Sequence, residues 1–386
     1  MMDRELVLAR RGVTLTFLVN GFTVGSFVAR IPDFKRILEI TDGTLGLSLL
    51  FVSFGVFLAL RPAGRNSARY GSSPIIFWAT LAVALSLPIL GLLPSLQFTW
   101  IALFIFGFVL ATQDVAMNAH AVVIEQRAGR RLMSTFHGVF SVGTLFGGIF
   151  GGFLSQIELS PLIQGFILAP VFIATALVVR RVLLPAEVDQ HPLEINKGER
   201  SPFVIWIFGI FGLFAALSEG AAGDWGGVLA RDTFNATPFI STLPYIVYTL
   251  AMVIGRFSGD FLAHRFGAAT IITIGGFLSS SSLALGLIVG GIPALMISWF
   301  LLGIGLSVVI PLMFSAAGTM ASTKFQGVIS PPQAIARVSG VSYFGFVIGP
   351  PVIGFLAEIF ELRWALFFIV ALCFSLVFAS RYAKSA

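Results

Sequence analysis

The chain of 386 residues is 57% hydrophobic and only 11% charged. A soluble globular domain carries about 25% charged residues, so this composition excludes a soluble protein and indicates an integral membrane protein. In such a chain the formal net charge of +6 is not the footprint of a nucleic-acid-binding protein. The single cysteine, Cys373, excludes an intrachain disulfide. Because the sequence holds no phosphate-binding loop, nucleophile motif or histidine cluster, we expect no enzyme activity, no cofactor and no metal site.

Runs without charged side chains predict twelve membrane-spanning helices, because one span needs roughly 20 such residues. Two runs, 70–113 and 266–323, have twice this length. Each contains a turn signal, Gly91–Ser95 in the first and Gly290–Pro293 in the second, and therefore predicts two helices. The other eight spans are predicted at 12–29, 43–60, 138–157, 159–179, 201–218, 233–255, 338–357 and 364–380. The first run lacks a cleavage site of small residues, so we expect it to remain as a helix.

The distribution of cations predicts the orientation of these spans. With the N-terminus in the cytoplasm, nineteen of the 24 Lys and Arg residues fall in inner connections. The outer connections hold only Arg30, Lys35, Arg36, Arg231 and Arg363. We therefore expect both termini in the cytoplasm.

A long polar segment at 185–201 divides the spans into six and six. It predicts an N-terminal bundle over 1–184, a cytoplasmic linker over 185–201 and a C-terminal bundle over 202–386. The halves also match as a repeat, because Arg69-Tyr70-Gly71 aligns with Arg265-Phe266-Gly267 at an offset of 196. At an offset of 202 the fifth span matches the eleventh at Gly138/Gly340, Val139/Val341, Gly143/Gly345, Gly147/Gly349, Gly152/Gly354, Phe153/Phe355 and Leu154/Leu356. Parallel six-helix repeats with a substrate site between them describe a large class of secondary transporter.

The stretch Gly255-Arg256-Phe257-Ser258-Gly259-Asp260-Phe261-Leu262-Ala263-His264-Arg265-Phe266-Gly267 resembles the signature loop of the major facilitator superfamily. Within it, Gln113-Asp114-Val115-Ala116-Met117-Asn118-Ala119 and Met133-Ser134-Thr135-Phe136-His137-Gly138 look like the fucose/sugar–proton symporter branch and its uncharacterised bacterial relatives. The resemblance implies the twelve-helix fold of that superfamily, a monomer in a bacterial inner membrane, and a small-molecule substrate moved together with protons.

The signature stretch also suggests a cytoplasmic gate. The carboxylate of Asp260 can hold Arg256 or Arg265 and so lock the cytoplasmic side shut. The alternative is a solvated carboxylate beside cations that only set the topology. The first-half copy has Gly64 where Asp260 lies, so we expect the clamp in the second half.

Ionisable residues inside spans are costly and mark transport pathways. In the fourth span, Asp114, Met117 and Asn118 share one helical face, which we expect to line a cavity. Asp114 is predicted to carry the coupling proton with His137 as its partner, and Asn118 is predicted to contact substrate. The alternative for Asp114 is a structural carboxylate bonded to Asn118. His120 lies off this face and is predicted at a helix interface.

The seventh span carries two acids and a tryptophan in a glycine-rich stretch, a composition found where transporter helices break along a cavity. Glu219 is predicted to couple protons or to bind a substrate hydroxyl. Trp225 is predicted to stack on sugar C–H groups, with an interfacial anchor as the alternative. Asp224 lies nearer the outer surface, where we expect it to pair with Arg231 or Arg30.

Three further groups complete the candidate substrate site. Asn20 lies in the middle of the first span, where the related symporters have an acid, so proton coupling must depend on Asp114 or Glu219. Tyr245 and Tyr343 are candidate cavity hydroxyls, as is Tyr248. Carboxylates with amides and an aromatic ring favour a proton-coupled importer of a hydroxylated solute such as a monosaccharide. The alternatives are proton-coupled efflux of drugs or amphiphilic metabolites and, as a minor one, a membrane sensor without transport.

Overall fold

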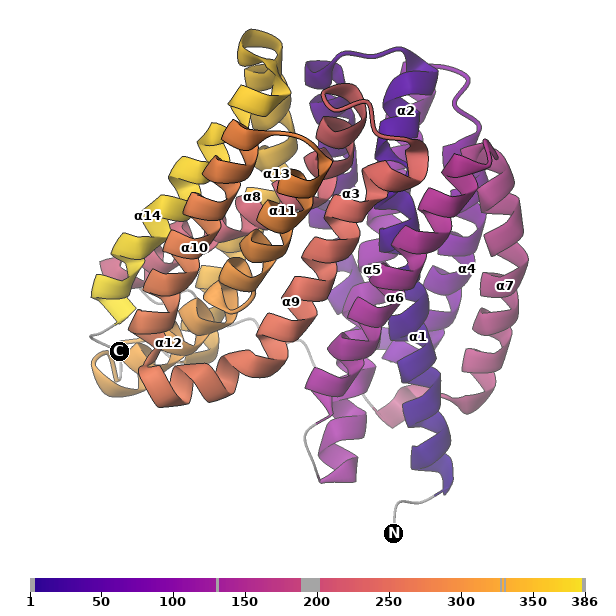
Figure 1. The fold of residues 1–386 in the computed structure, drawn as a ribbon. Helices are drawn as coiled ribbons and strands as arrows, with labels where there is room; N and C mark the ends of the chain where they lie inside the picture. Colours follow the sequence, from indigo (N-terminus) through magenta and orange to yellow (C-terminus); the bar gives the residue numbers. More distant parts are fainter. Residues whose placement is uncertain (1–3, 130–131, 189–201, 327, 330, 384–386) are drawn as a thin grey trace. The chain divides into compact units, whose positions relative to one another are not determined.

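The computed structural model describes residues 4–129, 132–188, 202–326, 328–329 and 331–383. The described residues fall into two compact units, one within residues 1–40 and 48–195 and the other within residues 41–47 and 196–386. The first part of the chain contains α1 (Arg4–Val28), α2 (Ile31–Leu38), α3 (Asp42–Tyr70), α4 (Ser72–Gly91), α5 (Leu96–Ala128), α6 (Met133–Gln156), α7 (Pro161–Val182) and the short 3-10 helix η1 (Ala186–Val188). The second contains α8 (Phe203–Asp232), α9 (Pro238–Phe266), α10 (Ala268–Val289), α11 (Ile292–Leu306), α12 (Val309–Thr323), α13 (Pro331–Ala365, interrupted at Glu361) and α14 (Phe367–Ala383) (Figure 1).

The described helices account for the predicted spans. Ten segments are long and apolar enough to cross a membrane, and α1 with α2, bent by 41°, makes an eleventh. The twelfth predicted segment, 364–380, contains α14, whose apolar part, Phe367–Ala379, is shorter. Both double-length runs divide at their predicted turns, because α4 ends at Gly91 and α10 ends at Val289. The fold is therefore the all-α membrane architecture that the charge-free runs predict.

Local sequence explains where several helices begin. The Ser95 hydroxyl accepts a hydrogen bond from the backbone N–H of Phe98, and the Ser160 hydroxyl accepts one from Ile163, so each serine caps a helix. Pro161 occupies the first turn of α7, where its missing N–H costs nothing. Glu125, near the end of α5, accepts hydrogen bonds from the first backbone N–H groups of α6 and so joins consecutive helices.

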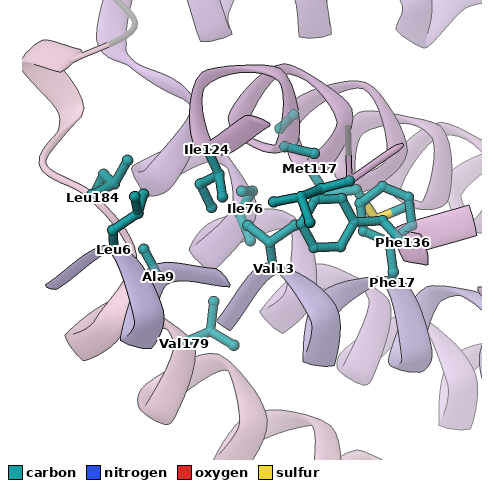
Figure 2. Close-up of a cluster of buried hydrophobic side chains, with 13 residues drawn as sticks. Leu6, Ala9, Val13, Phe17, Ile76, Met117, Ile124, Phe136, Val179 and Leu184 are labelled. Atoms are coloured by element: carbon teal, nitrogen blue, oxygen red, sulfur yellow. The ribbon is translucent and has the colours of Figure 1, made fainter. Parts of the chain in front are cut away.

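Glycines set the packing of α1 against α6 in the first unit. A Cβ atom at Gly143 would lie closer than 3.0 Å to the Leu18 carbonyl of α1, and one at Gly21 would meet the Phe140 carbonyl of α6 in the same way. Only glycine allows such an approach of two backbones in a membrane protein. Next to the N-terminal half of α1, side chains from α1, α4, α5, α6 and α7 form a buried cluster. It includes Phe17 of α1 and Phe136 of α6, whose ring centroids are 5.5 Å apart (Figure 2).

The second unit repeats this arrangement between α8 and α13. A Cβ atom at Gly345 would lie closer than 3.0 Å to the Leu213 carbonyl, and one at Gly212 would meet the Ser342 hydroxyl. Gly143 and Gly345 are aligned by the sequence repeat, so this identity reflects the same helix contact in both halves. Gly340, another repeat position, has nothing within 4 Å of its added Cβ.

The repeat also preserves a sharp junction. Gly71 joins α3 to α4 with φ 82° and ψ 152°, and Gly267 joins α9 to α10 with φ 83° and ψ 141°. Residues with a side chain rarely adopt this region, so glycine is required at both places. In each copy the preceding arginine lies over the neighbouring ring, Arg69 at 5.1 Å and Arg265 at 5.4 Å from its centroid.

Two of the five arginines and lysines predicted on the outer side bind carbonyl groups at helix ends. Arg363 donates from Nε to the Leu287 carbonyl at 2.7 Å and from Nη2 to the Ile288 carbonyl at 2.9 Å, at the end of α10. Arg30 donates to the Leu159 carbonyl just after α6 and pairs with Asp33 at 3.0 Å. The last carbonyls of a helix lack intrahelical partners and carry partial negative charge, which Arg363 satisfies at the end of α10.

Candidate functional site

In the first unit, α5 carries the predicted proton site. The side chain of Asn118 donates to the backbone carbonyl of Asp114 at 2.9 Å and to its carboxylate at 3.2 Å. Both residues are half-buried, and Met117 beside them is buried in the core cluster. Asp114 and Asn118 therefore share a face, as their spacing predicts. Within the described residues, Asp114 has this neutral amide as its hydrogen-bond partner.

Asn20 belongs to a buried hydrogen-bond network. Its side-chain amide donates to Gln113 Oε1 at 2.9 Å and to the Leu110 carbonyl at 3.3 Å, and Gln113 donates onward to the Thr80 hydroxyl at 2.8 Å. Asn20 is 2% exposed, so its amide holds α1 to α5 in this structure rather than facing a solute. Sequence reasoning assigned no role to Gln113 or Thr80. The available signal was the amide of Gln113 next to Asp114 inside a predicted span.

The two histidines of this unit differ in their surroundings. His120 is buried between α4, α5 and the chain after α7, where Nε2 accepts from the Leu184 backbone N–H at 3.2 Å. Nδ1 then carries the proton and donates to the Ser72 hydroxyl at 2.6 Å, as an interface residue would. His137 is exposed and meets Phe17 edge-on, with ring centroids 5.4 Å apart. The pairing of His137 with Asp114 stays a prediction.

In the second unit, Glu219 on α8 lies beside Arg256 on α9. Arg256 Nη2 is 3.8 Å from Glu219 Oε2, a separation of an ion pair without a hydrogen bond. The Glu219 side chain is 12% exposed and the Arg256 side chain 46% exposed. Glu219 Oε1 has no hydrogen-bond partner among the described residues.

Of two tyrosines on α9, Tyr248 lies next to this pair and Tyr245 lies near Asp224. Tyr248 interacts electrostatically with Glu219 and Arg256, and its buried hydroxyl has no hydrogen-bond partner in the described part of the chain. Tyr245 shares a hydrogen bond with Thr249 and lies near the carboxylate of Asp224. Tyr343 on α13 is 53% exposed and contacts Phe346, with ring centroids 6.3 Å apart. The structure thus brings Glu219 and Tyr248 together and leaves Tyr343 accessible.

The predicted stacking role of Trp225 stays a prediction. Its side chain is 0% exposed, so the ring is packed inside the second unit in this structure. Trp299, which sequence reasoning did not single out, packs nearby on α11 and donates from Nε1 to the Ala222 carbonyl at 3.0 Å. Both rings fill the glycine-rich part of α8, where Gly226 leaves room for Trp299.

The predicted cytoplasmic gate is only partly described. Arg256 pairs with Glu219, and Arg265 lies over the Phe266 ring. The side chain of Asp260 lies outside the described residues, so the clamp through Asp260 stays a prediction. Arg256 thus takes part in the same cluster as the candidate substrate residues.

Comparisons with known proteins agree with this architecture. The model of the Major Facilitator Superfamily matches residues 13–219 and again residues 207–384. An uncharacterized transporter of Sinorhizobium fredii is 30% identical over 97% of both chains, and an uncharacterized MFS-type transporter of Yersinia pestis is 31% identical over 96% of this chain and 94% of its own. The crystal structure of the nucleoside transporter NupG superposes with a TM-score of 0.75 over 98% of this chain and 99% of its own, at 14% identity. The chain therefore belongs to the major facilitator superfamily of membrane transporters.

Proposed function

We propose that the protein is a secondary active transporter that moves a small polar solute, a sugar or similar hydroxylated metabolite, together with protons by alternating access. The observation that carries the proposal is the carboxylate of Asp114, which lies within a membrane-spanning helix and is hydrogen-bonded by the neutral amide of Asn118. An ionised carboxylate is expensive there, because neither lipid nor a neutral amide replaces water. Exchange of a proton at Asp114 removes this cost and couples the helix to the proton gradient.

The unpaired hydroxyl of Tyr248 and the free oxygen of Glu219 support binding of a polar solute. Buried polar groups without partners are rare and indicate a ligand or water that completes them. A purely apolar drug would leave both groups without a hydrogen bond. Efflux of amphiphilic compounds is therefore the alternative that the experiment must separate from uptake of a hydroxylated solute.

The test begins with a ligand screen of the purified full-length protein in detergent. Cys373 is the sole cysteine and is 0% exposed, so a fluorogenic thiol dye reports unfolding directly. Sugars, sugar acids, nucleosides and cationic amphiphiles are screened, because a ligand that binds only the folded state raises its apparent stability. Stabilisation by amphiphiles alone would favour efflux.

Transport of the stabilising solute is then measured in proteoliposomes with an imposed pH gradient. Asp114→Asn is expected to abolish uphill, proton-driven accumulation while sparing counterflow exchange, since exchange needs no net proton movement. Glu187→Gln, in η1, removes a carboxylate outside the spans and serves as the matched control. If Asp114→Asn retains pH-driven accumulation, the proton site lies elsewhere or the protein is a uniporter.

A further inference from the structure

The cluster of Glu219, Tyr248 and Arg256 contains more hydrogen-bonding capacity than its own residues use. Glu219 Oε1 and the Tyr248 hydroxyl have no partner among the described residues, and Arg256 makes only the 3.8 Å ion pair there. Tyr248 is 6% exposed, whereas almost half of the Arg256 side chain is accessible. Two buried groups and one accessible cation therefore meet at a place where a ligand could complete their hydrogen bonds.

The chemistry of these groups selects the ligand. A guanidinium presents several N–H donors in a planar fork that matches a carboxylate, and a tyrosine hydroxyl can donate to the same oxygen atoms. Glu219 in its ionised form would repel an anion, but in its protonated form it becomes a third donor. We infer that Arg256, Tyr248 and Glu219 form a binding site for a solute that carries a single carboxylate, and that this solute binds together with one proton.

The charge balance of the cluster explains why the proton must accompany the anion. In the empty site the cation of Arg256 faces the anion of Glu219, and the pair is neutral. In the loaded site Arg256 faces the solute carboxylate and Glu219 carries the proton, so the net charge is again zero. Both states can therefore be enclosed within the membrane at a similar electrostatic cost, whereas an anion without the proton would leave one negative charge uncompensated.

Other titratable groups on the packed helices do not change this balance. Tyr245 on α9 shares a hydrogen bond with Thr249, and Asp224, further along α8, lies beside Tyr245. Cys373 on α14 lies near Tyr248 and shares a hydrogen bond with Ser218. The α13 helix, which packs against α8, carries Arg337, Tyr343, Glu358, Glu361 and Arg363. The side chain of Asp260, one turn beyond Arg256, is not described.

This inference rests on the proposed function for its transport consequence but is tested by binding alone. The probes are pairs of solutes that differ by one carboxylate: galacturonate and galactose, glucuronate and glucose, gluconate and sorbitol, lactate and 1,2-propanediol. Unfolding of the purified protein is followed through Cys373 at pH 6, 7 and 8. At least one carboxylate is expected to raise the apparent melting temperature while its neutral partner does not.

The pH dependence tests the coupled proton. Apparent affinity for the carboxylate is expected to rise by up to about tenfold for each unit of decreasing pH, the limit for uptake of one proton. Glu219→Gln, which is neutral and retains a donor, is expected to bind the carboxylate with little dependence on pH. Arg256→Gln is expected to lose the binding, and Arg61→Gln, an exposed arginine of α3, serves as the matched control.

Three results would overturn the inference. They are no stabilisation by any carboxylate of the panel, equal stabilisation by a neutral partner, or retained carboxylate binding in Arg256→Gln. Binding that is proton-linked but unaccompanied by transport in proteoliposomes would contradict the proposed function and leave the site intact. Conversely, proton-driven transport of a neutral sugar without carboxylate binding would support the function and refute the site.

Discussion

The side-chain amide of Asn20 donates a hydrogen bond to Gln113 Oε1, and this bond joins the middle of α1 to the middle of α5. Both residues are almost fully buried, and Gln113 continues the network to Thr80 on α4. Three helices of the first unit are therefore held in register by side-chain amides rather than by apolar contacts alone.

Asn20→Leu is expected to lower the stability of the protein by about 1–3 kcal/mol, because Gln113 Oε1 is left buried without a donor. The dye reaction of Cys373 on heating measures this loss. The double variant Asn20→Leu/Gln113→Leu removes both partners and is expected to lose less than the sum of the single variants. Additive losses would show that the two amides do not stabilise each other. Asn66→Ala, on an exposed part of α3, is the control.

Gly345→Ala is expected to destabilise the second unit, because the added methyl group meets the Leu213 carbonyl. Overpacking of this kind costs about 1–3 kcal/mol, which exceeds the gain of roughly 1 kcal/mol in helix propensity from glycine to alanine. Gly340→Ala, five residues earlier on α13, has open space and is expected to be neutral or stabilising. Gly345→Ala is therefore expected to melt at a lower temperature than Gly340→Ala. The reverse order would refute the close packing of α8 and α13.

His120→Leu is expected to cost about 1–3 kcal/mol, because the Leu184 backbone N–H and the Ser72 hydroxyl lose their buried partner. His137→Leu changes the same residue type at an exposed position and is expected to stay within about 0.5 kcal/mol. Both are measured by thermal unfolding in detergent. Equal effects of the two substitutions would contradict the assignment of His120 as the structural histidine.

Arg363→Lys is expected to unfold at a temperature between those of the parent protein and Arg363→Gln. A lysine keeps the charge at the end of α10 but lacks the planar fork that serves the Leu287 and Ile288 carbonyls together. Arg61→Lys, at an exposed position, is the matched control. Identical melting temperatures for Arg363→Lys and the parent protein would show that the charge alone is sufficient.

The sequence was sufficient to predict the spans because long runs without charged side chains are apolar enough to form membrane helices. Gly91 and Gly290 mark boundaries that the structure places within one residue, whereas α5 continues past its predicted end at 113 to Ala128. The repeat could also be recognised from the sequence, since Gly143 and Gly345 both lie at close helix contacts that leave no room for a side chain.

The partners of the site residues could not be predicted in the same way. Which side chains meet depends on how each helix is rotated about its own axis, and that rotation is set by packing over the whole unit. The ion pair between Arg256 on α9 and Glu219 on α8 depends on such a rotation, so the sequence alone does not identify it. The same reason explains why Trp225 was predicted to be accessible and Asn20 to face a solute, although both are buried.

The junction at Gly267 limits how α9 and α10 can move. One residue spans at most about 3.6 Å, so the end of α9 cannot slide along its axis without pulling the start of α10. The positive φ of this glycine lets the chain reverse direction without any spare length. Movement of α9 along its own axis without α10 is therefore excluded. Any displacement of Arg265, near the end of α9, also displaces the start of α10.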